Sequence, residues 1–172
     1  MANNNSDSKK MEKVIEALKK VPLETRQMIF NMAQEMSVSE IVQSFNQFAF
    51  DMFNTLIAIT KKINKEKEYK IDGYKKIFEA AIKKDIKLPA NRFTLDILLY
   101  APEIYAEEED CFLGMTIPDT NVSVNNEFGI IRSDKFKELW KIMIDTDKQD
   151  IKTNIISLTM YAHAFLYKTA NR

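Results

Sequence analysis

The stretch that decides the fold runs from Ser37 to Lys61 and reads SVSEIVQSFNQFAFDMFNTLIAITK. On a helical wheel its apolar side chains cover an arc of roughly 200°, whereas an ordinary surface helix carries an apolar stripe of roughly 100°. Ser37 and Glu40 have the spacing of a capping box, so the helix is expected to begin at this point. A helix that is apolar over so much of its circumference needs other elements on two of its sides. The stretch therefore predicts the central helix of a bundle.

The segments around this stretch are helical in pattern as well. Residues 8–20 carry a narrow apolar stripe, residues 23–36 carry a broader one, and a last helix is expected to end near Tyr167. Only 3 Gly and 4 Pro are present, which leaves few of the tight turns that a β-rich fold requires. We predict an all-α, single-domain bundle of about six to seven helices around the central helix 37–61. The domain is expected to span residues 8–172, after a polar tail at residues 1–7.

One region lacks helical periodicity. Residues 106–132 contain an acidic run followed by two segments with β-type residues, and Pro118 to Asn121 separates the two segments. Pro102, just before this region, is expected to force the chain out of helix. The pattern predicts an insertion at residues 106–132 that is either one long loop or a small β-hairpin.

The charge balance argues against several classes of partner. The 25 basic and 25 acidic side chains cancel, so no overall field would recruit nucleic acid, and a nucleic-acid partner is disfavoured. No apolar run approaches the roughly 18 to 20 residues that a membrane span needs, and the polar N-terminus does not have the pattern of a signal peptide. We expect a protein that is not secreted and that acts in the cytoplasm or inside a particle.

The residue types for familiar catalytic and metal sites are scarce. The chain has one His and one Cys, so a Cys/His zinc site cannot be assembled within it. Met160 stands three residues before His163, where the Glu-x-x-His motif of a di-iron bundle requires Glu. We therefore predict no catalytic residue, no metal ligand and no cofactor, and we expect the protein not to be an enzyme. A ligand-binding or enzymatic bundle that uses His163 stays open as a remote alternative.

Two helices have more apolar surface than a simple stripe requires. The candidate interface consists of an outlying flank of the central helix and a second stripe on the last helix: Phe50, Phe53, Ile57, Ile156, Met160, His163 and Tyr167. Such faces fit a structural or interaction protein that binds a protein partner or copies of itself. We expect a component of a larger assembly, such as a virion or phage particle. The alternative is a small regulatory or nucleic-acid-associated helical domain, which would use the lysines between Lys61 and Lys70.

Overall fold

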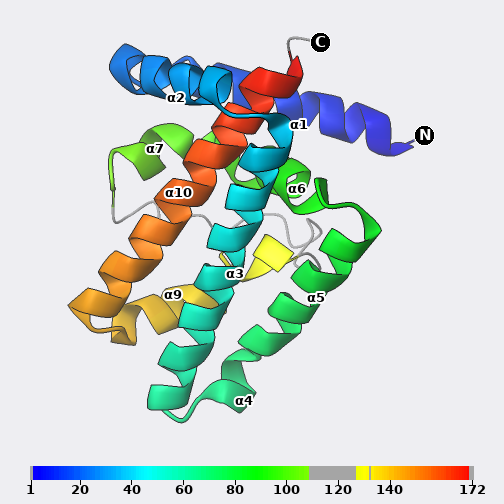
Figure 1. The fold of residues 1–172 in the computed structure, drawn as a ribbon. Helices are drawn as coiled ribbons and strands as arrows, with labels where there is room; N and C mark the ends of the chain where they lie inside the picture. The colour runs from blue at the N-terminus through cyan, green and yellow to red at the C-terminus, as the bar shows by residue number, and fades with distance from the viewer. Residues whose placement is uncertain (1, 109–126, 132, 171–172) are drawn as a thin grey trace.

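The computed structural model describes residues 2–108, 127–131 and 133–170, and within them the chain is all-helical (Figure 1). These residues form no strand. The α-helices are α1 (Ala2–Leu18), α2 (Leu23–Glu35), α3 (Val38–Lys62), α4 (Glu66–Tyr69), α5 (Ile71–Lys84), α6 (Leu88–Asp96), α7 (Ala101–Tyr105), α9 (Asp134–Ile142) and α10 (Asp145–Ala170), and the 3₁₀ helices are η1 (Leu98–Tyr100) and η2 (Glu127–Ile130).

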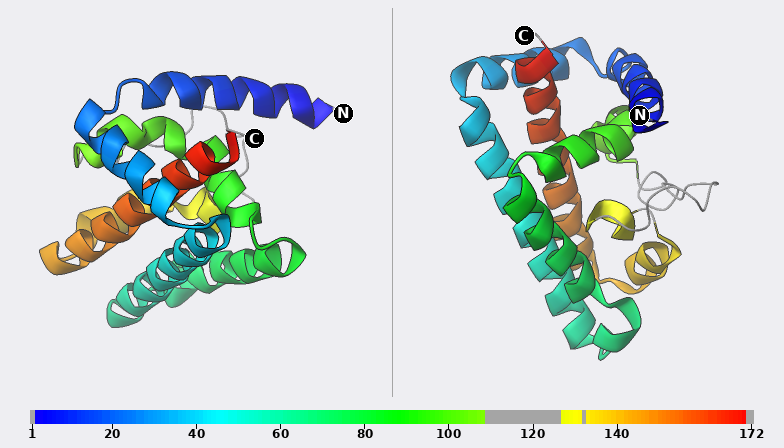
Figure 2. Two further views of the ribbon diagram at one scale, coloured as in Figure 1. Left: turned by 45° about the horizontal axis from the view of Figure 1, so that its top comes forward. Right: turned by 90° about the vertical axis from the view of Figure 1, so that its right-hand side faces the viewer.

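Helix α3 is the central helix that the sequence predicts. The Ser37 hydroxyl accepts a bond of 3.1 Å from the Glu40 amide, and the Glu40 carboxylate accepts one of 2.9 Å from the Ser37 amide. This reciprocal pair is the expected capping box, and it confirms where the helix begins. Helix α10 packs along one side of α3 and α5 along another, both running opposite to α3 (Figures 1 and 2). Covering on two sides accounts for the width of the apolar arc.

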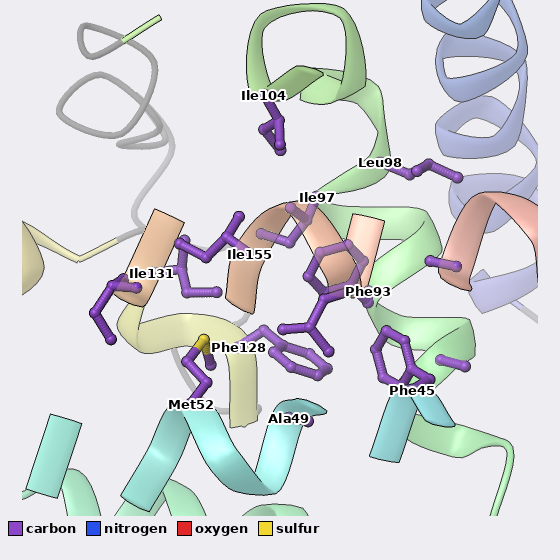
Figure 3. Packing of buried hydrophobic residues seen from close by; sticks show 14 of the residues in the cluster. Phe45, Ala49, Met52, Phe93, Ile97, Leu98, Ile104, Phe128, Ile131 and Ile155 are labelled. Atoms are coloured by element: carbon purple, nitrogen blue, oxygen red, sulfur yellow. The ribbon is translucent and has the colours of Figure 1, made fainter. Parts of the chain in front are cut away.

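The core centres on five aromatic rings from four helices. Phe128 of η2 lies with its ring centroid 5.2 Å from Phe93 of α6 and 5.9 Å from Phe45 of α3 (Figure 3). Phe53 lies about two turns after Phe45 on α3. Its ring centroid is 6.3 Å from that of Phe128 and 5.4 Å from that of Phe78 of α5. Edge-to-face and offset arrangements of this kind add stability beyond area burial. Helix η2 thus fills the space between α3, α5 and α6.

Several sequence predictions need correction. The described residues contain nine α-helices instead of six to seven, because α4 and α7 form in segments that we expected to be connections. Pro102 lies in the first turn of α7, where its missing N–H costs no intrahelical bond, so it begins a helix there. The polar segment 1–7 was expected to be a tail, but α1 already begins at Ala2. Extending an existing helix adds one backbone bond per residue, which helps even a polar segment to continue it.

The predicted insertion at 106–132 lies largely outside the described residues, at 109–126. Its C-terminal part is described and differs from the β-type pattern that we read there. Residues Glu127 to Ile130 form η2, and all four are buried. A half-buried strand would alternate between buried and exposed side chains. This segment instead places consecutive residues in the core, which a single 3₁₀ turn surrounded by three helices allows.

Candidate interaction site

The three predicted interface residues on α3 differ in how far their side chains are exposed. Phe53 is fully buried against Phe78 and Phe128, so its side chain is covered from within the chain and cannot meet a partner without unfolding. Ile57 is half-buried and packs against the core. Phe50 remains 37% exposed, with the Lys75 ammonium 4.6 Å from its ring centroid. Placing Phe53 at an interface was therefore wrong, and on this flank Phe50 offers the exposed ring.

The four predicted residues on α10 do not form one exposed face. Ile156 and Met160 are half-buried and pack against the core, and His163 is fully buried. Tyr167 is half-buried near the end of the helix, and its ring lies 4.6 Å from His163 and 5.9 Å from Phe30 of α2. The stripe is therefore partly covered along its length, and His163 is its one fully buried member.

His163 is enclosed by aromatic side chains. Its Nδ1 forms a hydrogen bond of 3.1 Å with the Tyr105 hydroxyl, and the Tyr105 ring stacks beside the imidazole at 6.1 Å. Burial, helped by the positive charge of Arg26, lowers the pKa of His163 to about 4, so the ring is neutral at neutral pH. Its Nε2 has no hydrogen-bond partner among the described residues. Burial also raises the pKa of Tyr105, so its hydroxyl stays protonated.

A pair of tyrosine and histidine rings can exchange a proton, and an acidic partner would orient the imidazole for that purpose. No carboxylate bonds the imidazole among the described residues, so nothing there orients it as a base in the way that an acidic partner would. Nor do the described residues bring together three or more His, Cys, Asp or Glu side chains. Cys111 lies outside the described residues. The cluster holds α7, α2 and α10 together at one end of the molecule.

The feature at this end of the molecule that borders solvent is an apolar groove between α1, α2 and the end of α10. We call it the terminal groove; it has a volume of about 280 Å³ and is lined by Ile15, Leu18, Lys19, Arg26, Leu166, Tyr167 and Ala170. Ile15 is 47% exposed, and Phe30, whose ring meets Tyr167 edge-on, is 37% exposed. The Lys19 ammonium is paired with the Glu16 carboxylate at 2.9 Å, so Arg26 supplies the positive charge that is not offset there. The groove is thus an apolar surface with one cationic group, Arg26, at its rim.

Specific polar bonds fix the walls of the terminal groove. The Nε of Arg26 donates to the Val21 carbonyl oxygen at 2.9 Å, which holds the start of α2 against the turn after α1. The Lys168 ammonium donates to the Ala33 carbonyl oxygen at 2.8 Å, and this bond ties the end of α10 to the last turn of α2. These two bonds join α2 to the turn after α1 and to the end of α10, and so hold the walls of the groove together.

Two other hollows are less suited to a partner. One, of about 640 Å³, lies beside α1, α6 and α10 and mixes Asp7, Asn91 and threonines with apolar side chains. The other, of about 530 Å³, lies between α3 and α5 and contains three lysines of the 61–70 segment, Lys61, Lys67 and Lys70. Glu66 and Asp72 lie in the same hollow, so its positive charge is largely offset. The lysines on which the nucleic-acid alternative depends do not stand apart from carboxylates.

Sequence reasoning found one member of the terminal groove, Tyr167, and missed the others. Ile15 and Leu18 have the spacing of a narrow core stripe on α1, and that spacing gave no sign that Ile15 would remain half in solvent. Phe30 belongs to the broad apolar stripe of residues 23–36, but it lies at the edge of the buried part formed by Ile29 and Ala33 and stays 37% exposed. The sequence does hold one sign that part of α2 stays exposed: its apolar face is wider than the stripe that a single neighbouring helix covers.

The described residues thus form an all-helical protein with an apolar groove where the ends of α1 and α10 meet α2. None of its described helices is both long and apolar enough to cross a lipid bilayer. No protein-family model matches the chain, and no solved structure matches it. The chain is 53% identical, over 169 residues, to the uncharacterized protein R465 of Acanthamoeba polyphaga mimivirus, an alignment that covers 98% of this chain and 94% of the relative. The chain therefore belongs to the same family as this viral protein.

Proposed function

We propose that the protein is a non-enzymatic interaction component of a viral assembly and that the terminal groove is its docking site. The observation that carries this proposal is the apolar lining of the groove, in which the exposed Ile15 and the half-buried Tyr167 take part, with the exposed Phe30 packed against Tyr167 beside it. Apolar side chains gathered at a hollow gain free energy when a partner removes them from water, by roughly 25 cal/mol for each Å² covered. The viral relative supports an assembly in a virus particle or in the cytoplasm of an infected cell.

The chemistry of the groove also suggests the kind of partner. An apolar floor with a cationic group at its rim suits a polypeptide segment that combines an aliphatic side chain with a carboxylate. Arg26 is well placed for this role, because its Nε is engaged by Val21 while no described residue accepts a bond from its terminal nitrogens. A partner carboxylate there would form a charge-assisted bond at the edge of the apolar contact.

Photo-cross-linking at two matched phenylalanines tests the proposal. Phe30 borders the terminal groove and Phe50 lies on α3, and both side chains are 37% exposed. Each is replaced in turn by p-benzoylphenylalanine, and the chain is expressed in its native host cells and irradiated. We expect a discrete protein adduct from position 30 that is absent or much weaker from position 50.

The outcomes separate the possible docking surfaces. An adduct from position 50 alone would move the docking site to the flank of α3 and overturn the assignment to the groove. Absence of an adduct from both positions, with the variants folded and expressed at the level of the unmodified chain, would overturn the interaction function itself. A small-molecule or nucleic-acid adduct at position 30 in place of a protein would have the same consequence.

A further inference from the structure

A second exposed apolar surface lies at the turn between α9 and α10. Ile142 is 47% exposed and Ile144 is 60% exposed, whereas Met143 between them is buried. Met143 has extended backbone geometry, with φ −68° and ψ 145°, so successive side chains there point to opposite sides. The buried Met143 therefore fixes both isoleucines outward. We call residues Ile142 to Asp145 the α9–α10 corner.

Carboxylates follow the α9–α10 corner and are opposite in charge to Arg26 of the terminal groove, while the exposed Lys141 precedes the corner. Asp145 and Asp150 are exposed in the first turns of α10, where carboxylates also complement the helix dipole. Asp147 is already bonded to Lys62, at 2.9 Å. The nearby Lys148 and Lys152 lie over the Trp140 ring, 5.8 and 5.9 Å from its centroid, on the side of α10 that faces α9. The corner thus presents two isoleucines beside the exposed carboxylates of Asp145 and Asp150.

The two surfaces lie at opposite ends of the longest helix. The corner is at the start of α10, and Leu166, Tyr167 and Ala170 place the terminal groove at its end (Figure 1). A helix of 26 residues is roughly 39 Å long, at 1.5 Å per residue. The corner of one chain therefore cannot reach its own groove, but it can reach the groove of another copy.

The groove has room for what the corner presents. A dry apolar cavity of about 150 Å³ is enough to bind benzene in another protein, and the terminal groove measures about 280 Å³. It can admit one branched aliphatic side chain and part of a second. With Ile144 in the groove, Asp145 next to it in sequence would lie near the Arg26 guanidinium at the rim, whereas Lys19 is already paired with Glu16. The apolar parts of the two surfaces are therefore complementary, and so are Asp145 and Arg26.

From these observations we propose that a second copy of the chain docks head to tail, with its α9–α10 corner in the terminal groove. This inference rests on the proposed function and names the partner at the same site. Because the two contacting surfaces differ, the contact is heterologous, and its repetition gives a ring or an open row of subunits. The contact is small, so the association is expected to be weak, in the micromolar to millimolar range of Kd, and to depend on concentration.

Two exposed isoleucines allow each surface to be disabled without disturbing the core. Ile15→Glu places a carboxylate in the groove, and Ile144→Lys places an ammonium on the corner. Ile86→Glu is the matched control, because Ile86 is 48% exposed but lies between α5 and α6, away from both surfaces. Circular dichroism and thermal melting verify that all three variants fold like the original chain, as expected for surface positions.

Sedimentation velocity over a concentration series from roughly 10 μM to 1 mM provides the readout. We expect the average mass of the original chain and of Ile86→Glu to rise above 20.0 kDa with concentration, while Ile15→Glu and Ile144→Lys each stay at the monomer mass. An equimolar mixture of Ile15→Glu and Ile144→Lys should form a dimer and nothing larger. In that mixture the intact corner of the first variant meets the intact groove of the second.

Other results would overturn the proposal. Self-association of Ile144→Lys alone would indicate groove against groove, and self-association of Ile15→Glu alone would indicate corner against corner. A monomeric original chain throughout the series, or a monomeric mixture, would refute head-to-tail pairing. If position 30 still cross-links to a different protein in that case, self-pairing fails while the proposed function stands; if position 30 gives no protein adduct either, both fail.

Discussion

Acidification should destabilise the protein through His163. The neutral imidazole is held by Tyr105 in a fully buried site, and its pKa falls from 6.5 to about 4. Between these two values the unfolded chain binds a proton that the folded chain does not bind, so the free energy of unfolding decreases as the pH falls. The contribution of His163 is complete above pH about 6.5 and is lost progressively towards pH about 4. At roughly 1.4 kcal/mol per pKa unit, the loss amounts to about 3 kcal/mol.

The measurement is urea denaturation at a series of pH values, followed by the fluorescence of the single tryptophan, Trp140, which is buried in the folded chain. The control is His163→Asn, which keeps a polar group near the position of Nδ1 but does not titrate. Subtracting the free energy of unfolding of this variant removes the contributions of carboxylates that titrate in the same range. We expect the difference between the two proteins to shrink by about 3 kcal/mol from pH 7.5 to pH 4. A difference that stays constant with pH would refute the idea that burial suppresses protonation of His163.

Three further predictions concern stability and use equilibrium unfolding in urea. Phe53→Ala should lower the free energy of unfolding by about 3 to 5 kcal/mol, because it leaves a cavity beside Phe78 and Phe128. Phe50→Ala on the same helix should lower it by well under half of that. Equal losses would contradict the assignment of Phe53 to the core. Arg92→Met should lower the free energy of unfolding by about 3 kcal/mol, because it removes the guanidinium that donates to the buried Glu127 carboxylate at 2.7 Å. Adding Glu127→Gln to this variant should recover part of the loss, because the buried negative charge is then gone. Ser37→Ala should cost about 1 kcal/mol through loss of the cap on α3, and a cost near zero would show that the capping box does not stabilise that end.

The sequence was most informative about α3, because its signals are local. The spacing of Ser37 and Glu40 determines the capping box through bonds between residues three apart, and the width of the apolar arc requires cover on two sides whatever the neighbours are. Neither inference depends on the rest of the fold. The start of the helix and its central position were therefore predictable from a short stretch.

The burial of individual residues on the same helix was not predictable. Phe50 and Phe53 both lie on the outer flank of the arc. Phe128 of η2 and Phe78 of α5 cover Phe53, whereas Phe50 stays 37% exposed, with the Lys75 ammonium over its ring. Phe128 is 75 residues further along the chain than Phe53, and no local pattern indicates that a 3₁₀ turn there enters the core. Cover supplied by distant segments is a tertiary property, so periodicity predicts how much apolar surface exists and not which part stays exposed.

The same reasoning explains why the surplus apolar surface of α10 lies at its ends. In the middle of the helix, Ile155, Leu158 and Ala162 are fully buried, and Ile156 and Met160 of the second stripe are half-buried against the core. Ile144, just before the helix begins, is 60% exposed, and the terminal groove lies beside Tyr167 near the other end. Substitutions in the middle should therefore act on stability and substitutions at the ends on association. This separation of the two effects along one helix is what allows the docking surfaces to be tested in folded protein.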